Sequence, residues 1–213
     1  MKNALLLSLC LGLFTSPAWG LDVETGLVDV TFHISHPAKE YDAHLSPDGG
    51  RGTITLEPGA IEKTQAKFTI LVDHFDSQNT RRDSHMVEVM EALVFPTIEW
   101  SVESVSGASG AWTPGTHTFQ ATGPLTVHGV TKPLTTPVTV TVAEDGSATF
   151  ASDFTILLED YAIERPTLVF VPIENELPIK VKVRTKANPE LFAQPAPPPP
   201  PAEAPAETEG ETE

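Results

Sequence analysis

Cysteine, cationic side chains and catalytic motifs are what this sequence has least of. The one cysteine, Cys10, lies in an apolar run from Leu5 to Phe14, which follows Lys2 and precedes the small-x-small sequence Ala18-Trp19-Gly20. This order is typical of a secretory signal peptide that is cleaved after Gly20. The mature chain would then contain no cysteine, which excludes disulfides and thiolate metal sites. We therefore expect an exported protein.

Positive charge is also scarce. The chain has 13 Lys and Arg residues against 29 Asp and Glu residues, a formal net charge of −16. Such an acidic chain is repelled by phosphate backbones and by anionic lipid headgroups. We therefore predict that neither nucleic acid nor an anionic membrane surface is its main partner.

Motifs for metal binding and catalysis are missing as well. His33 and His36 stand three residues apart in a predicted strand, so their side chains point to opposite faces. The sequence has no H-x-x-x-H or H-E-x-x-H spacing, no glycine-rich phosphate loop and no G-x-S-x-G nucleophile motif. We predict no metal site, no cofactor, no catalytic residue and no enzymatic activity.

The C-terminal segment lacks the apolar residues that a core requires. Pro197 to Pro201 are consecutive prolines, and an Ala/Glu/Thr-rich run continues to Glu213. Such a composition buries too little apolar surface to offset chain entropy. We predict disorder for residues 186–213 and one folded domain for residues 21–185.

Alternation of apolar and polar residues dominates that domain. Val28, Val30, Phe32 and Ile34 are separated by single polar residues, which is typical of a half-buried strand. Similar segments recur along the chain, and Asp145-Gly146 stands between two of them as a hairpin signal. They predict an all-β fold, an antiparallel sheet of about eight strands closed on itself as a barrel. A β-sandwich with a filled core fits the same pattern.

One segment has helical spacing instead. Met86, Val89, Met90 and Leu93 recur at intervals of three and four residues. We predict one short helix over residues 81–93, with Asp83 as a cap near its start and Pro96 closing the segment.

Two stretches resemble a known family. Residues 123–133, GPLTVHGVTKP, are similar to the LT-x-x-G-V-T-K-P signature of the YceI family, which are periplasmic lipocalin-like barrels that bind polyisoprenoid lipids. Residues 79–86, NTRRDSHM, and the later FPTIEW resemble a second family segment. A third match, Leu158 to Ala162, is looser, because the arginine and glycine of the family pattern are replaced. In the signature we expect the chain to turn between Gly129 and Pro133.

The resemblance implies a periplasmic carrier with a long apolar cavity that holds an isoprenoid chain, such as that of a quinone or polyprenol. Its partners would be that lipid, with a second copy of the chain and a membrane-side donor or acceptor protein also to be considered. The side chains expected to line the cavity are Phe32, Ile34, Phe68, Ile70, Trp100, Val102, Phe119, Leu125, Val127, Phe154 and Ile156.

Two other hypotheses stay open. One is a β-sandwich interaction module of the cell envelope with a filled core. The other is a hydrolase built on Arg82, Asp83 and His85, since a histidine with a carboxylate can transfer protons. No nucleophile is paired with this cluster by any motif, so we expect it to cap the helix and tie it to the rim of the barrel.

Overall fold

The computed structural model describes residues 20–168 and 170–192 of the chain. Residues 1–19 of the predicted signal peptide and residues 193–213 of the predicted tail lie outside the described residues. Export and disorder of the last 21 residues therefore stay predictions.

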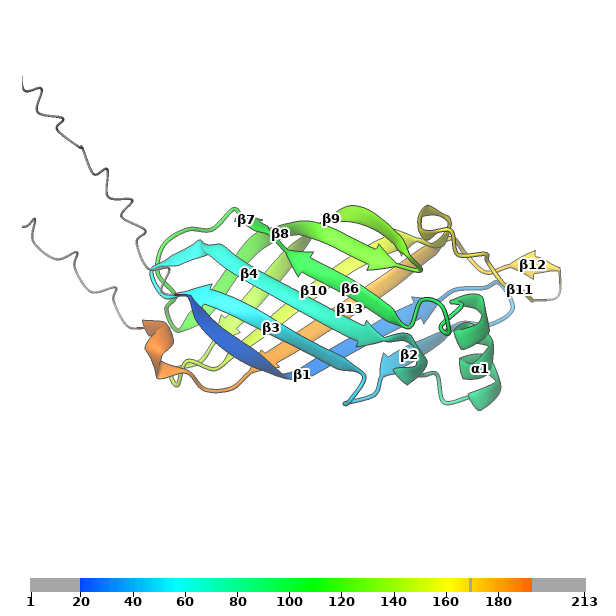
Figure 1. Ribbon diagram of the computed structural model, residues 1–213, viewed down its shortest axis with the longest axis horizontal. Coiled ribbons are helices and arrows are strands. Elements are labelled where there is room, and N and C mark those ends of the chain that lie inside the picture. Colours follow the sequence, from blue (N-terminus) through cyan, green and yellow to red (C-terminus); the bar gives the residue numbers. More distant parts are fainter. Residues whose placement is uncertain (1–19, 169, 193–213) are drawn as a thin grey trace, which may run out of the picture.

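Antiparallel strands make up most of the described chain (Figure 1). Eleven of them form one sheet. Two more, β11 (Thr167–Leu168) and β12 (Val171–Pro172), form a separate hairpin. The strands of the large sheet are β1 (Leu21–Ile34), β2 (Tyr41–Leu45), β3 (Gly50–Glu57), β4 (Ala60–Leu71), β5 (Phe75–Asp76), β6 (Thr97–Val102), β7 (Ser104–Ser106), β8 (Gly115–Val127), β9 (Val130–Val142), β10 (Ala148–Leu157) and β13 (Glu176–Thr185). The all-β prediction with antiparallel strands and one α-helix is confirmed.

β1 joins the two flanks of the sheet. It pairs with β3 over Leu21–Glu24 and with β13 over Thr25–Phe32, and its last residues pair with β2. β2 pairs in turn with β5, where the path of paired strands ends.

The prediction of a sheet of about eight strands that closes on itself as a barrel is therefore wrong in two respects. The sheet has eleven strands, because β2, β5 and β7, with 5, 2 and 3 residues, are too short to show a clear period-two pattern. In addition, β2 and β5 extend from β1 as a side branch, so the sheet is not a simple closed cylinder.

The turn of the signature stretch lies at His128-Gly129. Val127 pairs with Val130 across this two-residue loop, and both loop residues have positive φ, 49° and 72°. This is the backbone of a type I′ hairpin, whose twist matches that of the flanking strands. The expected turn is thus confirmed at Gly129 but not at Pro133, which lies within β9 opposite Pro124. The predicted Asp145-Gly146 hairpin, between β9 and β10, is confirmed.

The one α-helix of the described residues, α1, spans Thr80–Val89 and is shorter than predicted. Asn79 caps it, because its side-chain oxygen accepts a hydrogen bond from the backbone N–H of Arg82. Asp83 does not fill this role. Its carboxylate accepts from the backbone N–H and the hydroxyl of Ser77 instead, at 3.0 and 2.6 Å.

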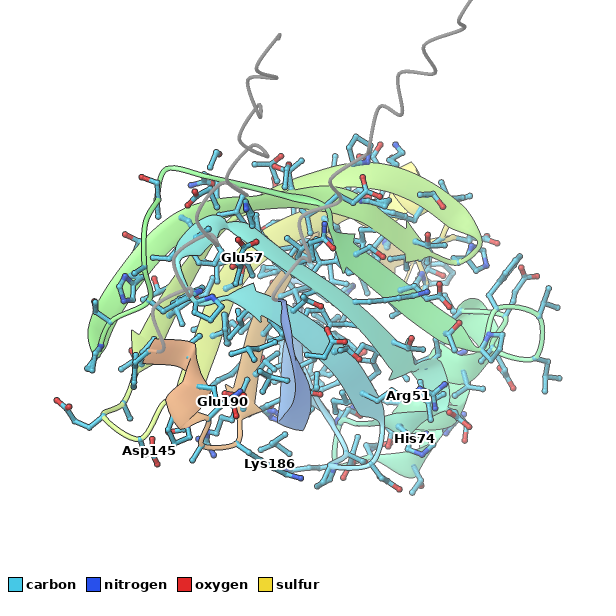
Figure 2. All side chains as sticks on the ribbon, turned by 60° about the vertical axis from the view of Figure 1, so that its left-hand side comes forward. Arg51, Glu57, His74, Asp145, Lys186 and Glu190 are labelled. Atoms are coloured by element: carbon cyan, nitrogen blue, oxygen red, sulfur yellow. The ribbon has the colours of Figure 1, made fainter. Side chains whose placement is uncertain are left out.

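The C-terminal boundary of the domain also differs from the prediction. Residues 189–192 form the 3-10 helix η3 (Pro189–Phe192), and Leu191 is buried in the main core. In Figure 2, Lys186 and Glu190 lie beside Asp145 of the β9–β10 turn. Consistent with this, a Cβ atom on Gly146 would stand only 2.0 Å from the carbonyl oxygen of Asn188. The prediction that disorder begins at residue 186 is therefore wrong for residues 186–192.

Candidate apolar cavity

A cavity of about 220 Å³ lies inside the sheet. A buried water needs only about 10–15 Å³ of such space, so the cavity is large enough for a substantial ligand. Its wall consists mainly of alternate, inward-facing residues of the long strands, including Val28 and Val30 of β1, Phe154 and Ile156 of β10, and Ile179 of β13. The sheet therefore does not enclose a core that is filled along its whole length, as a β-sandwich would.

The cavity occupies only one half of the length of the sheet. Its lining residues come from the end of β1, β4, β8 and β10, and from the beginning of β6 and β13. α1 contributes Met86, and the 3-10 helix η2 (Leu158–Tyr161) contributes Leu158. In Figure 1, α1 stands at this end of the sheet, and we call this end of the cavity its mouth.

The opposite half of the interior is filled. Trp112, only 2% exposed, packs with its ring centroid 6.4 Å from those of both Phe119 and Phe150. Its backbone N–H donates to the carbonyl of Pro58, and the buried Leu191 belongs to the same core cluster. These bulky side chains close the end of the sheet that lies away from the mouth.

A stacked aromatic pair lies between the two halves. The rings of Phe68 and Trp100 are nearly parallel, with centroids 6.0 Å apart. Both side chains, together with Val181, line the large cavity and also a small cavity of about 40 Å³ behind it. They therefore set the inner limit of the large cavity.

The sequence-predicted lining residues divide between these two spaces. Val102 and Phe119 line the small cavity but not the large one. The alternation of β6 and β8 correctly places them on the inward face, but it carries no information about depth along the strand. The predicted residues that line the large cavity are Phe32, Ile34, Phe68, Ile70, Trp100, Leu125, Val127, Phe154 and Ile156. Whether they bind a ligand stays a prediction.

Polar side chains are gathered at one edge of the cavity. Tyr41, Ser77, Arg82, Asp83 and His85 all contribute to its lining. The guanidinium of Arg82 lies 4.3 Å from the ring centroid of Tyr41, and its Nε donates to the hydroxyl of Ser77 at 3.1 Å. Burial raises the pKa of the Tyr41 phenol, Arg82 opposes this shift, and Asp83 adds to it.

This network ties α1 to β2 and to the residues before the helix, as expected of a structural cluster. Asp83 is engaged by Ser77, whereas His85 is 60% exposed and its Nδ1 lies 3.5 Å from Glu88. The three residues of the hydrolase hypothesis are therefore neighbours at the mouth, but no hydrogen bond joins His85 to Asp83 in the described structure.

Loops around the mouth are linked to one another by side-chain contacts. His128 of the β8–β9 turn bridges Glu91, just after α1, and the carbonyl of Tyr161 in η2. Arg165 links η2 to the segment after β12 through Glu159 and the carbonyl of Ile173. These contacts hold the rim in one arrangement.

The β1–β2 loop completes the rim. The buried ring of His36 donates from Nε2 to the carbonyl of Val171 at 3.2 Å and accepts at Nδ1 from the backbone N–H of Ala38. The backbone N–H of Glu174 donates to the carbonyl of Ser35. His36 is therefore a structural residue that fixes the β11–β12 hairpin beside the mouth.

Several lining residues could not be recognised from the sequence. Ile163, Pro166 and Ile173 lie in irregular segments around the β11–β12 hairpin, where no periodic pattern marks the inward side. The helical spacing of Met86 and Met90 predicts the apolar side of a helix, but it does not indicate that these residues line a cavity.

Two further properties concern the described residues alone. Within residues 20–168 and 170–192, no three His, Cys, Asp or Glu side chains are grouped so that they could hold a metal ion. Helices in the same part of the chain are too short or too polar to cross a bilayer.

Together, the fold and the cavity define an all-β protein with an internal apolar chamber that opens at one end. A family model for the YceI-like domain matches residues 21–185, so the chain belongs to the YceI-like family. No curated protein matches the chain.

Solved structures show the same fold at low sequence identity. BcnA of Burkholderia cenocepacia is 17% identical, with a TM-score of 0.64 over 75% of this chain and 96% of that protein. A polyisoprenoid binding domain from Saccharophagus degradans, implicated in plant cell wall breakdown, is 12% identical, with a TM-score of 0.59 over 78% and 98%. The YCEI protein of Campylobacter jejuni is 17% identical, with a TM-score of 0.56 over 68% and 85%.

Proposed function

We propose that this YceI-like protein is an exported, periplasmic carrier that holds a polyisoprenoid lipid, such as a quinone or polyprenol, in its large cavity. The observation that carries the proposal is the lining itself, which is apolar everywhere except at the mouth. A structural neighbour described as a polyisoprenoid binding domain also supports it.

Binding would be driven by the hydrophobic effect. Each methylene-sized group transferred from water to an apolar wall contributes about 0.8 kcal/mol, so a few isoprene units suffice for tight binding. The chain would lie along the strands with its polar end near Tyr41 and Arg82. Such a role requires no catalytic residue, metal or cofactor, and we propose that the protein has none.

Native mass spectrometry of the protein purified from its own periplasm, followed by organic extraction, tests this function. We expect a co-purifying apolar species of several hundred daltons. Ile179→Glu places a carboxylate at the cavity wall and should abolish its retention, because burying an unpaired charge is costly. Lys180→Glu introduces the same group on the outer face of the same strand and should retain the ligand.

A second variant tests whether the ligand is lost because the cavity is blocked or because the protein is misfolded. Val181→Trp fills the inner part of the cavity without adding charge, so it should also exclude the ligand. Circular dichroism must show that both cavity variants keep their strand content. A bare polypeptide mass for the wild type, with no uptake of added polyprenols or quinones, would overturn the proposed function.

A further inference from the structure

The large apolar side chains that are exposed to solvent gather at one end of the described structure. Leu93 is 100% exposed, Val94 68%, Phe170 98% and Val171 43%, and Leu157 is exposed to a smaller extent. Single exposed apolar residues are normally scattered over a protein surface. Here all five belong to the end of the sheet where the cavity has its mouth.

Four of these side chains project from two separate loops. Leu93 and Val94 follow α1, and Phe170 and Val171 lie at the β11–β12 hairpin. Figure 1 shows α1 and this hairpin at the same end of the molecule, opposite to η3.

Residues next to the exposed side chains anchor both loops to the rest of the protein. Next to Leu93 and Val94, the ring of Phe95 packs edge-on against His128, with centroids 4.8 Å apart. Next to Phe170, the carbonyl of Val171 is hydrogen-bonded to His36. The exposed side chains are thus presented outward by fixed backbone, although turning them inward would have removed apolar surface from water.

A lipid bilayer fits this surface better than a protein partner. A standard protein interface buries about 800 Å² of accessible surface on each partner. Four side chains on two loops provide much less surface than this. A bilayer interior, in contrast, accepts apolar side chains from separate loops without matching their shape.

The charges of the rim restrict the kind of bilayer. Two cations, Lys39 and Arg81, are exposed there, and Lys132 and Arg165 are each paired with a carboxylate of η2. The exposed carboxylates outnumber them and belong to Glu40, Glu88, Glu91, Glu164 and Glu174. Since the rim is acidic, anionic headgroups would be repelled, and a surface of zwitterionic lipid would not.

From these observations we infer that Leu93, Val94, Phe170 and Val171 insert into a zwitterionic lipid surface and dock the cavity mouth against it. This inference rests on the proposed function, because it supplies the route by which the lipid ligand enters. Docked in this way, an isoprenoid chain would pass from bilayer to cavity without crossing water.

Vesicle co-sedimentation of the full chain provides the test. We expect binding to phosphatidylcholine–phosphatidylethanolamine vesicles and weaker binding once phosphatidylglycerol is added. In the triple variant Leu93→Ser, Val94→Ser, Phe170→Ser, the partition coefficient should fall about a hundredfold, because three apolar side chains that would leave water on docking are lost. The conservative variant Leu93→Met, Phe170→Leu should bind like the wild type.

A matched control places serine at exposed alanines of the opposite end, Ala111→Ser and Ala143→Ser, and should leave vesicle binding unchanged. Absence of binding by the wild type would overturn the inference. So would binding that persists in the serine variant, or a serine variant whose only change is the loss of a dimer in light scattering.

Ligand uptake separates this inference from the proposed function. Uptake of a short-chain prenol from dilute detergent should be equal in the wild type and the serine variant, whereas uptake from vesicles should be slowed in the variant. If the prenol binds neither protein while vesicle docking is still observed, the proposed function fails and the docking surface stands.

Discussion

His128 and Glu91 are joined at the mouth of the cavity, with 3.0 Å between Nε2 and the carboxylate, and both residues have positive φ. The other ring nitrogen of His128 lies 3.2 Å from the carbonyl oxygen of Tyr161. Since both partners are acceptors, the ring donates to both of them only when both nitrogens carry a proton. This one side chain therefore connects three segments of the rim.

Replacing His128 tests the contribution of this connection. His128→Asn keeps a residue type that tolerates positive φ but loses both contacts, and should lower the free energy of unfolding by about 1–2 kcal/mol. His128→Ala loses the same contacts and should cost roughly 1 kcal/mol more, because alanine resists the left-handed region. Urea denaturation measures both. Equal values for the two variants would show that the backbone conformation contributes nothing.

Gly129, the next residue, is predicted to be intolerant of any side chain for two reasons. Its φ is +72°, and a Cβ atom would lie 2.5 Å from the ring of Phe95. Gly107 has a φ of +88°, but a Cβ atom there would meet nothing within 4 Å, so Gly107→Ala reports the backbone cost alone, about 1 kcal/mol.

Gly129→Ala should cost about 1–3 kcal/mol beyond the value for Gly107→Ala, since it adds overpacking to the same backbone strain. Adding Phe95→Ala to the Gly129→Ala protein should recover part of that difference in a double-mutant cycle. If the two alanine variants unfold at the same urea concentration, the close approach of Phe95 has no energetic consequence.

The end of the domain gives a third prediction. Because Leu191 is 1% exposed within the main core, Leu191→Ala should destabilise the protein by about 2–4 kcal/mol. A chain that ends after Phe192 should be as stable as the full chain in thermal unfolding. A chain that ends after Thr185 should be destabilised about as much as the Leu191→Ala variant. Equal melting temperatures for the two truncated chains would contradict the boundary seen in the structure.

The inner limit of the cavity gives a fourth prediction. Trp100→Ala should join the large and the small cavity, so that the protein accepts longer polyprenols than the wild type does. Phe75→Ala enlarges the large cavity without touching the small one and should leave this length limit unchanged. Competition between polyprenols of different length, read by mass spectrometry, measures the limit. A lower stability of Trp100→Ala is expected but does not affect the ranking of ligands.

The sequence predicted the strands best where they are long and two-faced. Val28 to Ile34 and the residues of β13 alternate cleanly because one side faces the interior and the other faces water. The same alternation cannot show how deep a residue lies, so it predicts the same position for Phe119 as for Leu125, although Phe119 packs against Trp112 in the filled half.

The errors at the ends of elements have a similar physical origin. Leu191 and Phe192 are two apolar residues directly before a proline-rich segment, so local composition predicted disorder, and only a tertiary contact in the core orders them. The rim depends on His36 and His128, whose partners Val171 and Tyr161 lie far away in sequence. Such pairs leave no local pattern, and sequence reasoning therefore described the wall of the cavity better than its mouth.

Alkaline pH provides the last prediction, at Tyr161 below the mouth. Burial raises the pKa of its phenol, and the neighbouring carboxylate of Asp160 raises it further. In the unfolded chain a tyrosine loses its proton near pH 10, so above that pH the folded protein holds more protons than the unfolded chain. Its contribution to stability is therefore complete below about pH 10 and is lost as the pH rises through the raised pKa of the folded state. Tyr161→Phe should show a shallower fall in the free energy of unfolding between about pH 9.5 and 11 than the wild type. Lysine titration affects both proteins alike, so the difference between the two slopes is the quantity to measure, and parallel curves would mean that burial does not hold the phenol in its neutral form.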